Sequence, residues 1–377
     1  MANNLLGVGE AAPWFVCSTQ SRQRFVFDTV GGRYVLLCFF ASAADPVSQA
    51  LLAGLSKQRQ RFDDLNLAFF GVSVDADDAR LQRVVESLPG VRYFWDVDRQ
   101  VSRLYGACRE DGRYQRVSYV LDPMLRVLAV LPFVGDAAAH LQVLTQVLDN
   151  LPQIGAPCRA AFQAPVLVLP RIFEPSLCRE LMDYYRAHGG ERSGYMQDID
   201  GKTVQVIGQT HKSRRDCLVE DETLREACAL RIHQRLVPQI ERAFQFKVSR
   251  MERYLIGCYD AEEEGHFRPH RDNTTKGTAH RRFAVSLYLN SGEYEGGWLR
   301  FPEFGAALYS APQGGAVVFA CSLLHEALPV TRGRRFMFLP FLYDEAAKQI
   351  REANLGYLEE GVRGAADVAG DSPTASG

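Results

Sequence analysis

The sequence lacks the features that mark several large classes of protein. Its longest apolar run, 34–44, falls well short of the roughly 20 residues that a membrane-spanning helix needs. Its 43 Lys and Arg residues nearly balance its 45 Asp and Glu residues, so no global charge draws the chain to nucleic acid or to an anionic membrane. The first residues lack the basic start and the apolar stretch of a secretory signal. We therefore expect a cytoplasmic protein without a membrane or nucleic-acid partner.

Clustered cysteines are also missing. The nine cysteines are scattered, their number is odd, and no two stand in a Cys-x-x-Cys pair. Several lie inside apolar runs, such as Cys38 in VLLCFF and Cys321 in VVFACS. The pattern favours buried free thiols in a reducing compartment over disulfides, and it gives no support to a zinc site made of thiolates.

A proline- and glycine-containing segment, 150–157, divides the chain into two parts, and 377 residues exceed the usual size of one domain. We predict a first domain over 1–150, a linker over 151–163, a second domain over 164–363, and a small, polar, disordered tail over 364–377.

Strands and helices alternate in the first part. The continuous apolar runs 34–41 and 67–74 are typical of strands buried on both faces. Pro46 stands where a helix can begin, and the residues up to Phe62 have helical periodicity. Further elements are expected as helices over 76–88 and 137–148 and as a strand pair over 116–122 and 127–133. This order predicts an α/β sandwich.

The second part has a different character. An amphipathic helix is predicted over 175–188, ended by Gly189 and Gly190, and a second helix over 221–246. From Val248 onward, short apolar segments are separated by glycine, asparagine and proline. Helices followed by many short strands predict an antiparallel barrel or jelly roll with helical support.

Over residues 5–150 the chain resembles the peroxiredoxin branch of the thioredoxin fold, in the motifs GVGEAAPWF, VLLCFFASAADPVS, FWDVDRQVSRLYGA and RVSYVLD. In that family the strand that corresponds to residues 34–41 ends in a proline. A threonine follows four residues later, and the peroxidatic cysteine follows three residues after the threonine. Here the positions hold Ala41, Asp45 and Ser48, and only Arg116 of RVSYVLD matches. A serine hydroxyl does not ionise at neutral pH and cannot replace a thiolate. We expect a non-catalytic domain that serves dimerisation or docking.

The candidate chemistry lies in the second part. His270 and Asp272, in HFRPHRDN, are two residues apart and would share a face in an extended strand, although a surface loop explains an isolated pair more simply. His325 ends an apolar strand, and Arg335 lies ten residues beyond it. Two imidazoles and one carboxylate form the facial triad of non-haem Fe(II) oxygenases, but zinc hydrolases also use such sets. An arginine at that spacing could bind a co-substrate carboxylate bidentately.

Residues 165–345 resemble the 2-oxoglutarate- and Fe(II)-dependent dioxygenases, specifically the prolyl 4-hydroxylase-like branch. The matched motifs are HFRPHRDN, RRFAVSLYLN, YEGGWLRFPEFG and GAVVF followed after six residues by HEALPVTRGRR. The resemblance implies a double-stranded β-helix, or jelly roll, with His270, Asp272 and His325 as the iron ligands.

The same resemblance implies the co-substrate site. Arg335 would bind the distal carboxylate of 2-oxoglutarate, helped by Tyr288 of the SLYLN segment. Tyr259 matches the family's co-substrate tyrosine, with two extra residues between it and His270. The implied cofactors are Fe(II), 2-oxoglutarate and O2, with ascorbate as an optional addition.

The implied reaction is hydroxylation of an unactivated C–H bond with release of succinate and CO2. A carboxylate at Asp272 favours hydroxylation, because relatives that halogenate carry a small residue at that position. The branch suggests a prolyl residue of a protein or peptide as the substrate, and a small molecule stays open. Two other hypotheses are a thiol-dependent peroxidase or redox sensor, which needs a reactive cysteine where Ser48 stands, and a non-catalytic module that senses iron or oxygen.

Several other polar residues receive a structural interpretation. His266 is expected to be a solvated loop histidine, and Glu303 and the segment 211–215 are expected to be solvated faces. Arg271 should point away from the metal, because it lies between two residues that share a face.

Overall fold

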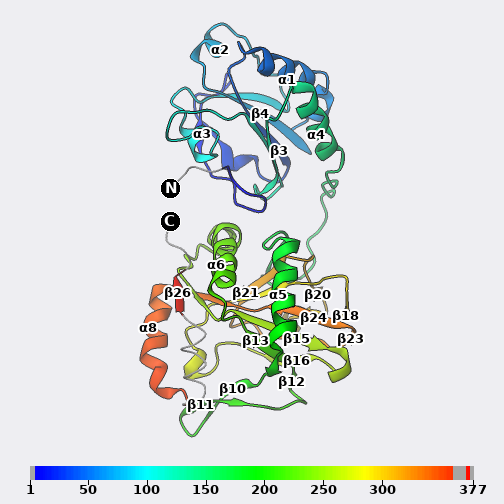
Figure 1. Ribbon diagram of the computed structural model, residues 1–377, viewed down its shortest axis with the longest axis vertical. Coiled ribbons are helices and arrows are strands. Elements are labelled where there is room, and N and C mark those ends of the chain that lie inside the picture. Colours follow the sequence, from blue (N-terminus) through cyan, green and yellow to red (C-terminus); the bar gives the residue numbers. More distant parts are fainter. Residues whose placement is uncertain (1–4, 360–370, 374–377) are drawn as a thin grey trace. The chain divides into compact units, whose positions relative to one another are not determined.

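The computed structural model describes residues 5–359 and the strand β26 (Asp371–Pro373). The chain forms two compact units, Met1–Cys158 and Arg159–Gly377. Each unit contains its own sheets and its own apolar core (Figure 1). Apart from β26, the predicted disordered tail lies outside the described residues. The helices of the described residues include none with the length and apolar character that a membrane crossing requires.

The first unit is built on a five-stranded sheet of order β5-β4-β3-β6-β7. The strands β3 (Tyr34–Ala41), β4 (Leu67–Ser73) and β5 (Val91–Trp95) are parallel, β6 (Val117–Leu121) pairs antiparallel with β3, and β7 (Val127–Pro132) pairs antiparallel with β6. β4 is buried along its whole length and β3 along all but its ends, as their continuous apolar sequences predict.

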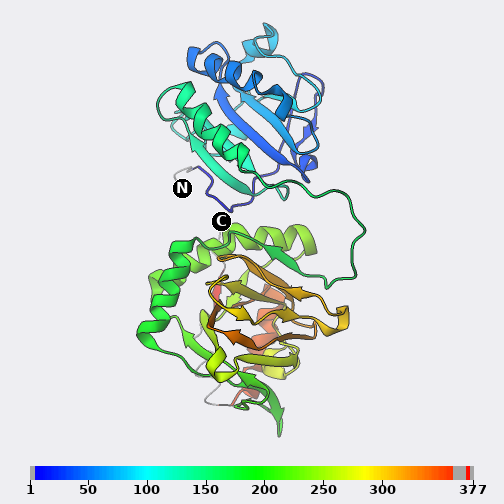
Figure 2. The ribbon, with the colours of Figure 1, turned by 90° about the vertical axis from the view of Figure 1, so that its right-hand side faces the viewer.

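Two helices cover one face of this sheet (Figure 2). They are α1 (Pro46–Ser56) and α4 (Ala137–Asp149), which insert Leu51, Leu55 and Leu144 into an apolar cluster with the strands. The other face is covered by the N-terminal strands β1 (Val16–Cys17) and β2 (Phe25–Val26) and by α3 (Gln100–Leu104). These layers confirm the predicted α/β sandwich.

The predicted helix over 76–88 is wrong beyond its first turn. The helix α2 spans only Ala76–Arg80, and Gln82 takes a φ of 51°, outside the helical region. The apolar residues Leu81, Val85 and Leu88 are 50, 52 and 54% exposed, so a longer helix would have no buried face to stabilise it.

Ser48, which the peroxiredoxin resemblance aligns with the peroxidatic cysteine, lies in the first turn of α1 and is fully buried. Its hydroxyl donates to the carbonyl oxygen of Phe40 at 2.6 Å, and its N–H donates to the Asp45 carboxylate at 2.9 Å. Arg116, the one matching catalytic-site residue, has its Nη2 2.8 Å from Oδ2 of the same carboxylate. The cation that would activate a nucleophile is therefore paired with Asp45.

The second unit contains a ten-stranded and a five-stranded antiparallel sheet. The larger sheet comprises β8 (Leu167–Leu169), β9 (Glu191–Arg192), β13 (Arg215–Leu218), β14 (Arg250–Glu252), β15 (Leu255–Asp260), β17 (Phe283–Tyr288), β21 (Ala316–Ala320), β24 (Arg334–Phe338), β25 (Phe341–Tyr343) and β26. The smaller sheet comprises β12 (Lys212–Ser213), β16 (His266–His270), β22 (His325–Ala327), β19 (Leu299–Arg300) and β20 (Leu308–Tyr309). Two-stranded pairs are formed by β10 (Tyr195–Ile199) with β11 (Lys202–Val206) and by β18 (Glu295–Gly296) with β23 (Val330–Arg332).

Side chains of both sheets meet in one apolar cluster. Phe267 and Leu299 of the smaller sheet share it with Tyr288 and Met337 of the larger sheet. Two antiparallel sheets packed over a common core are what a jelly roll requires, and the specific jelly-roll winding stays a prediction.

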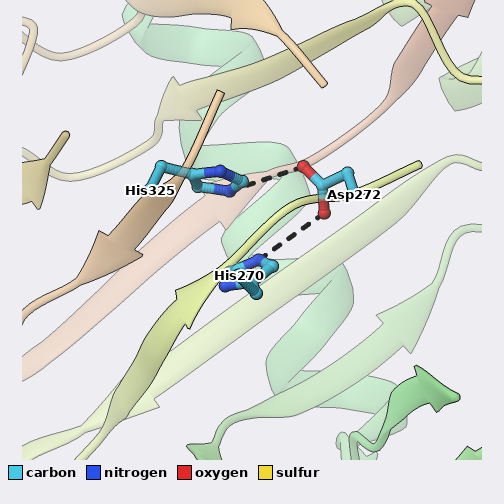
Figure 3. Close-up of side chains that lie close together, drawn as sticks. All are labelled: His270, Asp272 and His325. Atoms are coloured by element: carbon cyan, nitrogen blue, oxygen red, sulfur yellow. Dashed lines mark ion pairs between the residues drawn. The ribbon is translucent and has the colours of Figure 1, made fainter. Parts of the chain in front are cut away.

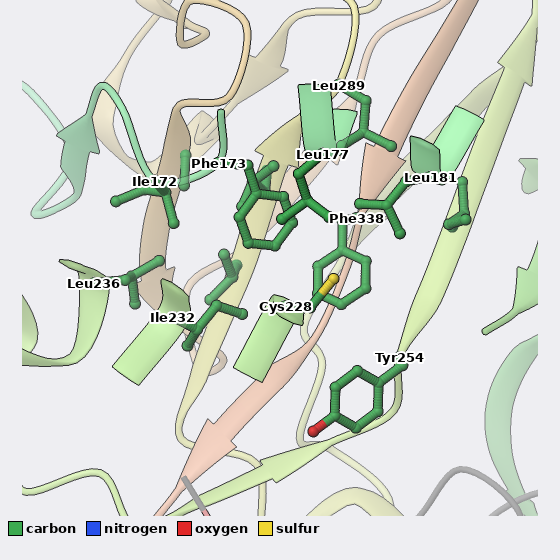
Figure 4. Packing of buried hydrophobic residues seen from close by; sticks show 14 of the residues in the cluster. Ile172, Phe173, Leu177, Leu181, Cys228, Ile232, Leu236, Tyr254, Leu289 and Phe338 are labelled. Carbon is green, nitrogen blue, oxygen red and sulfur yellow. The ribbon is translucent and has the colours of Figure 1, made fainter. Parts of the chain in front are cut away.

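Helices support the larger sheet from its other side. The helices α5 (Pro175–His188), α6 (Glu222–Arg231) and α7 (Val237–Phe244) bury Leu177, Ile232 and neighbouring apolar residues against Phe338 of β24 (Figure 4). The second predicted helix, 221–246, is confirmed as a continuous helical stretch over 222–244, in which a π-helical turn, Ile232–Leu236, joins α6 to α7 just before the proline in the first turn of α7. The last helix, α8, spans Glu345–Asn354.

We expect Ser48→Cys to produce no thiol peroxidase. The Asp45 carboxylate beside the new thiol opposes thiolate formation, and a rise of the thiol pKa by about one unit already lowers the thiolate fraction about tenfold. The measurement is peroxide-dependent oxidation of a thiol reductant. Ser48→Cys combined with Asp45→Thr frees Arg116 and is the matched comparison. Peroxide turnover by Ser48→Cys alone would contradict this account.

Candidate functional site

Two histidines at the centre of the site face each other across neighbouring strands. β16 and β22 pair antiparallel, with His270 opposite His325 and Phe267 opposite Ala327. The interval from Phe267 to His270 on β16 is three residues long, whereas the interval between their partners on β22 is two. This extra residue is a β-bulge in β16, next to Pro269. A bulge changes the direction in which the following side chains point, and proline suits such a position because it has no N–H for the ladder.

Asp272 completes a cluster with these two rings. Its Oδ1 lies 3.5 Å from Nε2 of His270 and its Oδ2 lies 3.4 Å from Nε2 of His325 (Figure 3). One donor atom from each residue can be chosen such that all three lie within 4.8 Å of one another. Within the described residues this is the one group of three or more His, Cys, Asp or Glu side chains with the spacing of a metal site.

Main-chain carbonyl groups fix the tautomers of both imidazoles. Nδ1 of His270 lies 2.8 Å from the carbonyl oxygen of Arg268, and Nδ1 of His325 lies 3.0 Å from that of Leu323. A carbonyl oxygen can only accept, so each Nδ1 carries the proton and each Nε2 presents a lone pair toward Asp272. This is the outer support that metal-binding histidines usually have.

The charge states of the cluster also suit a divalent cation. Burial, reinforced by His270, lowers the pKa of His325 to about 4, so its imidazole is neutral at neutral pH. Burial alone raises the pKa of the Asp272 carboxyl, but His325, His270 and Arg281 outweigh it and hold that pKa well below its usual range. Neutral imidazole nitrogen and ionised carboxylate oxygen are donors that Fe(II) and Zn(II) accept.

The cluster lines a cavity of about 490 Å³, which is a typical size for a small-molecule site. Tyr259 contributes to the same wall, together with the cationic side chains of Lys212, Arg214, Arg253 and Arg281. The site therefore combines a possible metal position with a strongly cationic lining.

Arg335 lies behind this wall rather than on it. It is opposite Tyr259 in the pairing of β24 with β15, and its guanidinium lies 5.0 Å from the Tyr259 ring centroid and 5.1 Å from that of Tyr288. Its side chain is 1% exposed, its Nε has no hydrogen-bond partner, and no carboxylate of the described residues lies within ion-pair distance. A buried charge without a counter-ion is costly, so this position fits an anionic ligand.

Gly297, which sequence reasoning did not single out, makes room for Arg335. It has a φ of 65°, and a Cβ at this position would lie 2.8 Å from Cδ of Arg335. The adjacent glycines of the GGWLRF motif are the signal that could have identified it, because paired glycines often permit a close approach of backbone to a side chain.

The expectation of a solvated face over 211–215 is wrong for its central residues. Lys212 and Arg214 are buried, because β12 pairs with the ligand strand β16. Nζ of Lys212 donates to Oγ of Ser193 and to the carbonyl oxygen of Gly194, both at 2.6 Å. Arg214 forms a bidentate pair with Asp216, at 2.6 Å for both bonds, so its charge is compensated.

Glu303 links the two segments that carry the candidate ligands. Its Oε1 lies 2.7 Å from Nη2 of Arg271, and its Oε2 accepts the N–H of Leu324 at 3.1 Å. Arg271 thus pairs with Glu303 and does not join the cluster of His270 and Asp272.

His266 is not the solvated histidine that was expected. It is buried, and its ring nitrogens lie 2.6 and 3.2 Å from the carbonyl oxygens of Glu264 and Thr210. These contacts occupy both nitrogens, so His266 has a structural role.

Two protein-family models match separate parts of the chain. Residues 8–130 match the AhpC/TSA family, and residues 254–343 match the 2OG-Fe(II) oxygenase superfamily. The second match contains His270, Asp272, His325 and Arg335.

Curated relatives resemble the chain over parts of its length. The chain is 26% identical over 125 residues to alkyl hydroperoxide reductase C of Mycobacterium tuberculosis, covering 32% of this chain and 64% of that protein. It is 32% identical over 88 residues to a multifunctional procollagen lysine hydroxylase and glycosyltransferase of Caenorhabditis elegans, covering 22% of this chain and 11% of that protein. The chain thus spans less than two thirds of either relative.

Solved structures give similar partial matches. A prolyl-4-hydroxylase of Pseudomonas putida aligns with a TM-score of 0.37 and 20% identity, covering 48% of this chain and 94% of the other. AhpC of Mycobacterium tuberculosis aligns with a TM-score of 0.33 and 21% identity, covering 40% and 97%.

We expect His270→Ala, Asp272→Ala and His325→Ala each to weaken divalent-metal binding by more than about 100-fold. Loss of an outer hydrogen-bond partner of a metal ligand already costs about 10–100-fold, and loss of the ligand itself should cost more. The measurement is calorimetric titration with Mn(II). His188→Ala, which changes an exposed histidine of α5, is the matched control. Undiminished binding by any of the three variants would remove that residue from the site.

Proposed function

We propose that the protein, which combines an AhpC/TSA-family peroxiredoxin-like domain with a 2OG-Fe(II) oxygenase domain, is an Fe(II)- and 2-oxoglutarate-dependent hydroxylase. The observation that carries this proposal is the pairing of a His-Asp-His cluster with the buried, uncompensated Arg335 in one sheet sandwich. A metal site alone fits several reactions, whereas a metal site beside an unpaired buried cation fits a chelating ligand that also bears a distant carboxylate.

In this proposal His270, Asp272 and His325 hold the iron. A set of only three protein donors would leave room at the iron for the co-substrate and for O2. The rings of Phe267 and Phe319 lie against the two imidazoles, at centroid distances of 3.4 and 4.5 Å, and limit access of water to the metal side of the cavity.

Arg335 receives the distal carboxylate of 2-oxoglutarate. Tyr288 is fully buried, and burial raises its hydroxyl pKa to about 12, so it remains a neutral hydrogen-bond donor beside the guanidinium. Tyr259 lines the cavity on one side and contacts Arg335 on the other, so it forms the boundary that the co-substrate must pass. The distal carboxylate would compensate the buried positive charge of the Arg335 guanidinium.

The iron, when bound with 2-oxoglutarate and O2, supplies the oxidising power for an unactivated C–H bond. The overall reaction is balanced as R–H plus 2-oxoglutarate plus O2 giving R–OH, succinate and CO2. The chain itself positions the reactants: Nδ1–H bonds to carbonyl groups orient both imidazoles, and Glu303 holds the two ligand segments together. Ascorbate, as a reductant that keeps the metal as Fe(II), is part of the proposal.

The substrate we propose is a prolyl residue of a protein or peptide. The name of the Caenorhabditis elegans relative describes a hydroxylase of procollagen lysine, which favours a polypeptide substrate. The peroxiredoxin-like domain would then dock a partner or dimerise, because Ser48 and the Asp45–Arg116 pair leave it without a thiolate nucleophile.

Succinate formation tests the proposal. Protein loaded with Fe(II) under anaerobic conditions should release succinate on exposure to O2 and 2-oxoglutarate, and proline-containing peptides should increase the yield. The alanine variants of the three candidate iron ligands should release none, whereas His188→Ala should retain activity. Metal and 2-oxoglutarate binding without any succinate would instead favour an iron- or oxygen-sensing module.

Arg335→Ala should raise the 2-oxoglutarate concentration needed for half-maximal turnover by roughly 10- to 100-fold, because a charge-assisted hydrogen-bonded pair contributes about 1.5–3 kcal/mol. The iron requirement should change little. Gly297→Ala should shift the same parameter in the same direction, because its methyl group displaces the Arg335 side chain. Arg332→Ala, which removes an exposed arginine on β23, is the control. An unchanged 2-oxoglutarate requirement in Arg335→Ala would show that another residue binds the co-substrate.

A further inference from the structure

A second arginine without a counter-ion lies on the cavity lining, where it is half-buried. Arg253 lies between β14 and β15 with a φ of 57°, a left-handed conformation that residues other than glycine rarely adopt. Its side chain lines the same cavity as the His-Asp-His cluster. Backbone strain of this kind is often retained where a functional side chain must point in a set direction.

The two buried arginines of the same lining, Arg214 and Arg281, are compensated. Arg214 is paired with Asp216, at 2.6 Å for both bonds. Arg281 is paired with Glu252, at 2.6 and 3.1 Å. Each of these two arginines therefore already has its own carboxylate partner.

Arg253 has no such partner among the described residues. Its Nε donates to the carbonyl oxygen of Leu339 at 3.1 Å, and its guanidinium lies 4.4 Å from the Phe341 ring centroid. No carboxylate of the described residues lies within ion-pair distance of it, and no described group accepts from its two Nη atoms. The two Nη atoms of this lining residue thus have no protein acceptor, and the planar N–H donors of a guanidinium can bind a carboxylate bidentately.

The electrostatic surroundings make this cation receptive to an anion. Burial, together with the neighbouring Arg281 and Arg214, lowers the pKa of Arg253 to about 10. Desolvation and the repulsion from Arg281 and Arg214 therefore destabilise the positive charge of Arg253. A carboxylate bound beside it would offset both effects.

Arg253 and Arg335 have different places and suit different ligands. Arg335 is on β24, sealed behind Tyr259 and Tyr288, and does not line the cavity. Arg253 is on the cavity lining itself, where a ligand of the cavity can reach it.

We propose that Arg253 binds a carboxylate of the substrate, so that the enzyme selects acidic substrates. This inference rests on the proposed function, because it assigns the second unpaired arginine to the molecule that is hydroxylated. The carboxylate can come from an acidic side chain next to the target residue of a peptide or from the free acid group of a small molecule.

Binding of matched peptides tests the proposal without turnover. The full chain is loaded with Mn(II) and 2-oxoglutarate, and labelled proline peptides that carry Glu beside the proline are compared with the same peptides carrying Gln. The unmodified protein should bind the Glu peptide about tenfold or more tightly, as expected for a charge-assisted pair. Arg253→Gln should abolish this preference, and Arg253→Lys should keep part of it. Arg332→Gln, at an exposed site, should leave it unchanged.

A second arm identifies the source of the carboxylate. Free proline and N-acetylproline are compared with their amides. A preference for the free acids that disappears in Arg253→Gln, without any preference among the peptides, assigns the site to a small molecule. Retained binding of Mn(II) and an unchanged circular dichroism spectrum show that each variant is folded.

Three results would overturn the proposal. They are equal binding of the acid and the amide in both arms, an unchanged preference in Arg253→Gln, and weaker 2-oxoglutarate binding in Arg253→Gln, which would place Arg253 in the co-substrate site. Failure of the proposed function is separate, because it is an absence of succinate release, whereas the preference for acids is measured without chemistry.

Discussion

The antiparallel pairing of β16 with β22 sets the positions of all three candidate ligands. It places His270 opposite His325, and the bulge at Pro269 changes the direction of β16 immediately before the turn that carries Asp272. Main-chain carbonyl groups of the same segments then hold both imidazoles with Nε2 toward the carboxylate. Because backbone geometry positions the donors, a cation could bind with little rearrangement of the chain.

Buried positive charge is the second organising feature of this unit. Arg214 and Arg281 each have a carboxylate partner, whereas Arg335 and Arg253 have none among the described residues. Proteins rarely bury an uncompensated cation, so the buried Arg335 indicates where an anion belongs, and the half-buried Arg253 offers a second position on the cavity lining. Arg335 lies behind Tyr259 and Arg253 lies on the cavity lining, and we propose that the first binds the co-substrate and the second the substrate. In the first unit the corresponding arginine has a partner: Asp45 compensates the charge of Arg116, so no free positive charge lies beside Ser48.

Sequence reasoning succeeded where one local signal dominates. The strand β3 was predicted with its bounds, because a short continuous apolar run is stable only when both of its faces are buried. The cluster of His270, Asp272 and His325 could be proposed from spacing and family resemblance, but the bulge beside Pro269 could not. The burial of Lys212 and Arg214 was missed because it depends on the pairing of β12 with β16, which joins segments about 55 residues apart. A missing counter-ion, as at Arg253, is visible only when every neighbour is placed in space.

The most direct test of the account is a crystal structure of the protein with Mn(II) and 2-oxoglutarate, with the metal located by its anomalous scattering. The account predicts a metal peak bound by Nε2 of His270, Nε2 of His325 and a carboxylate oxygen of Asp272, with the distal carboxylate of 2-oxoglutarate on Arg335. A metal peak outside this cluster, or a 2-oxoglutarate carboxylate bound at Arg253 while Arg335 stays unpaired, would contradict it.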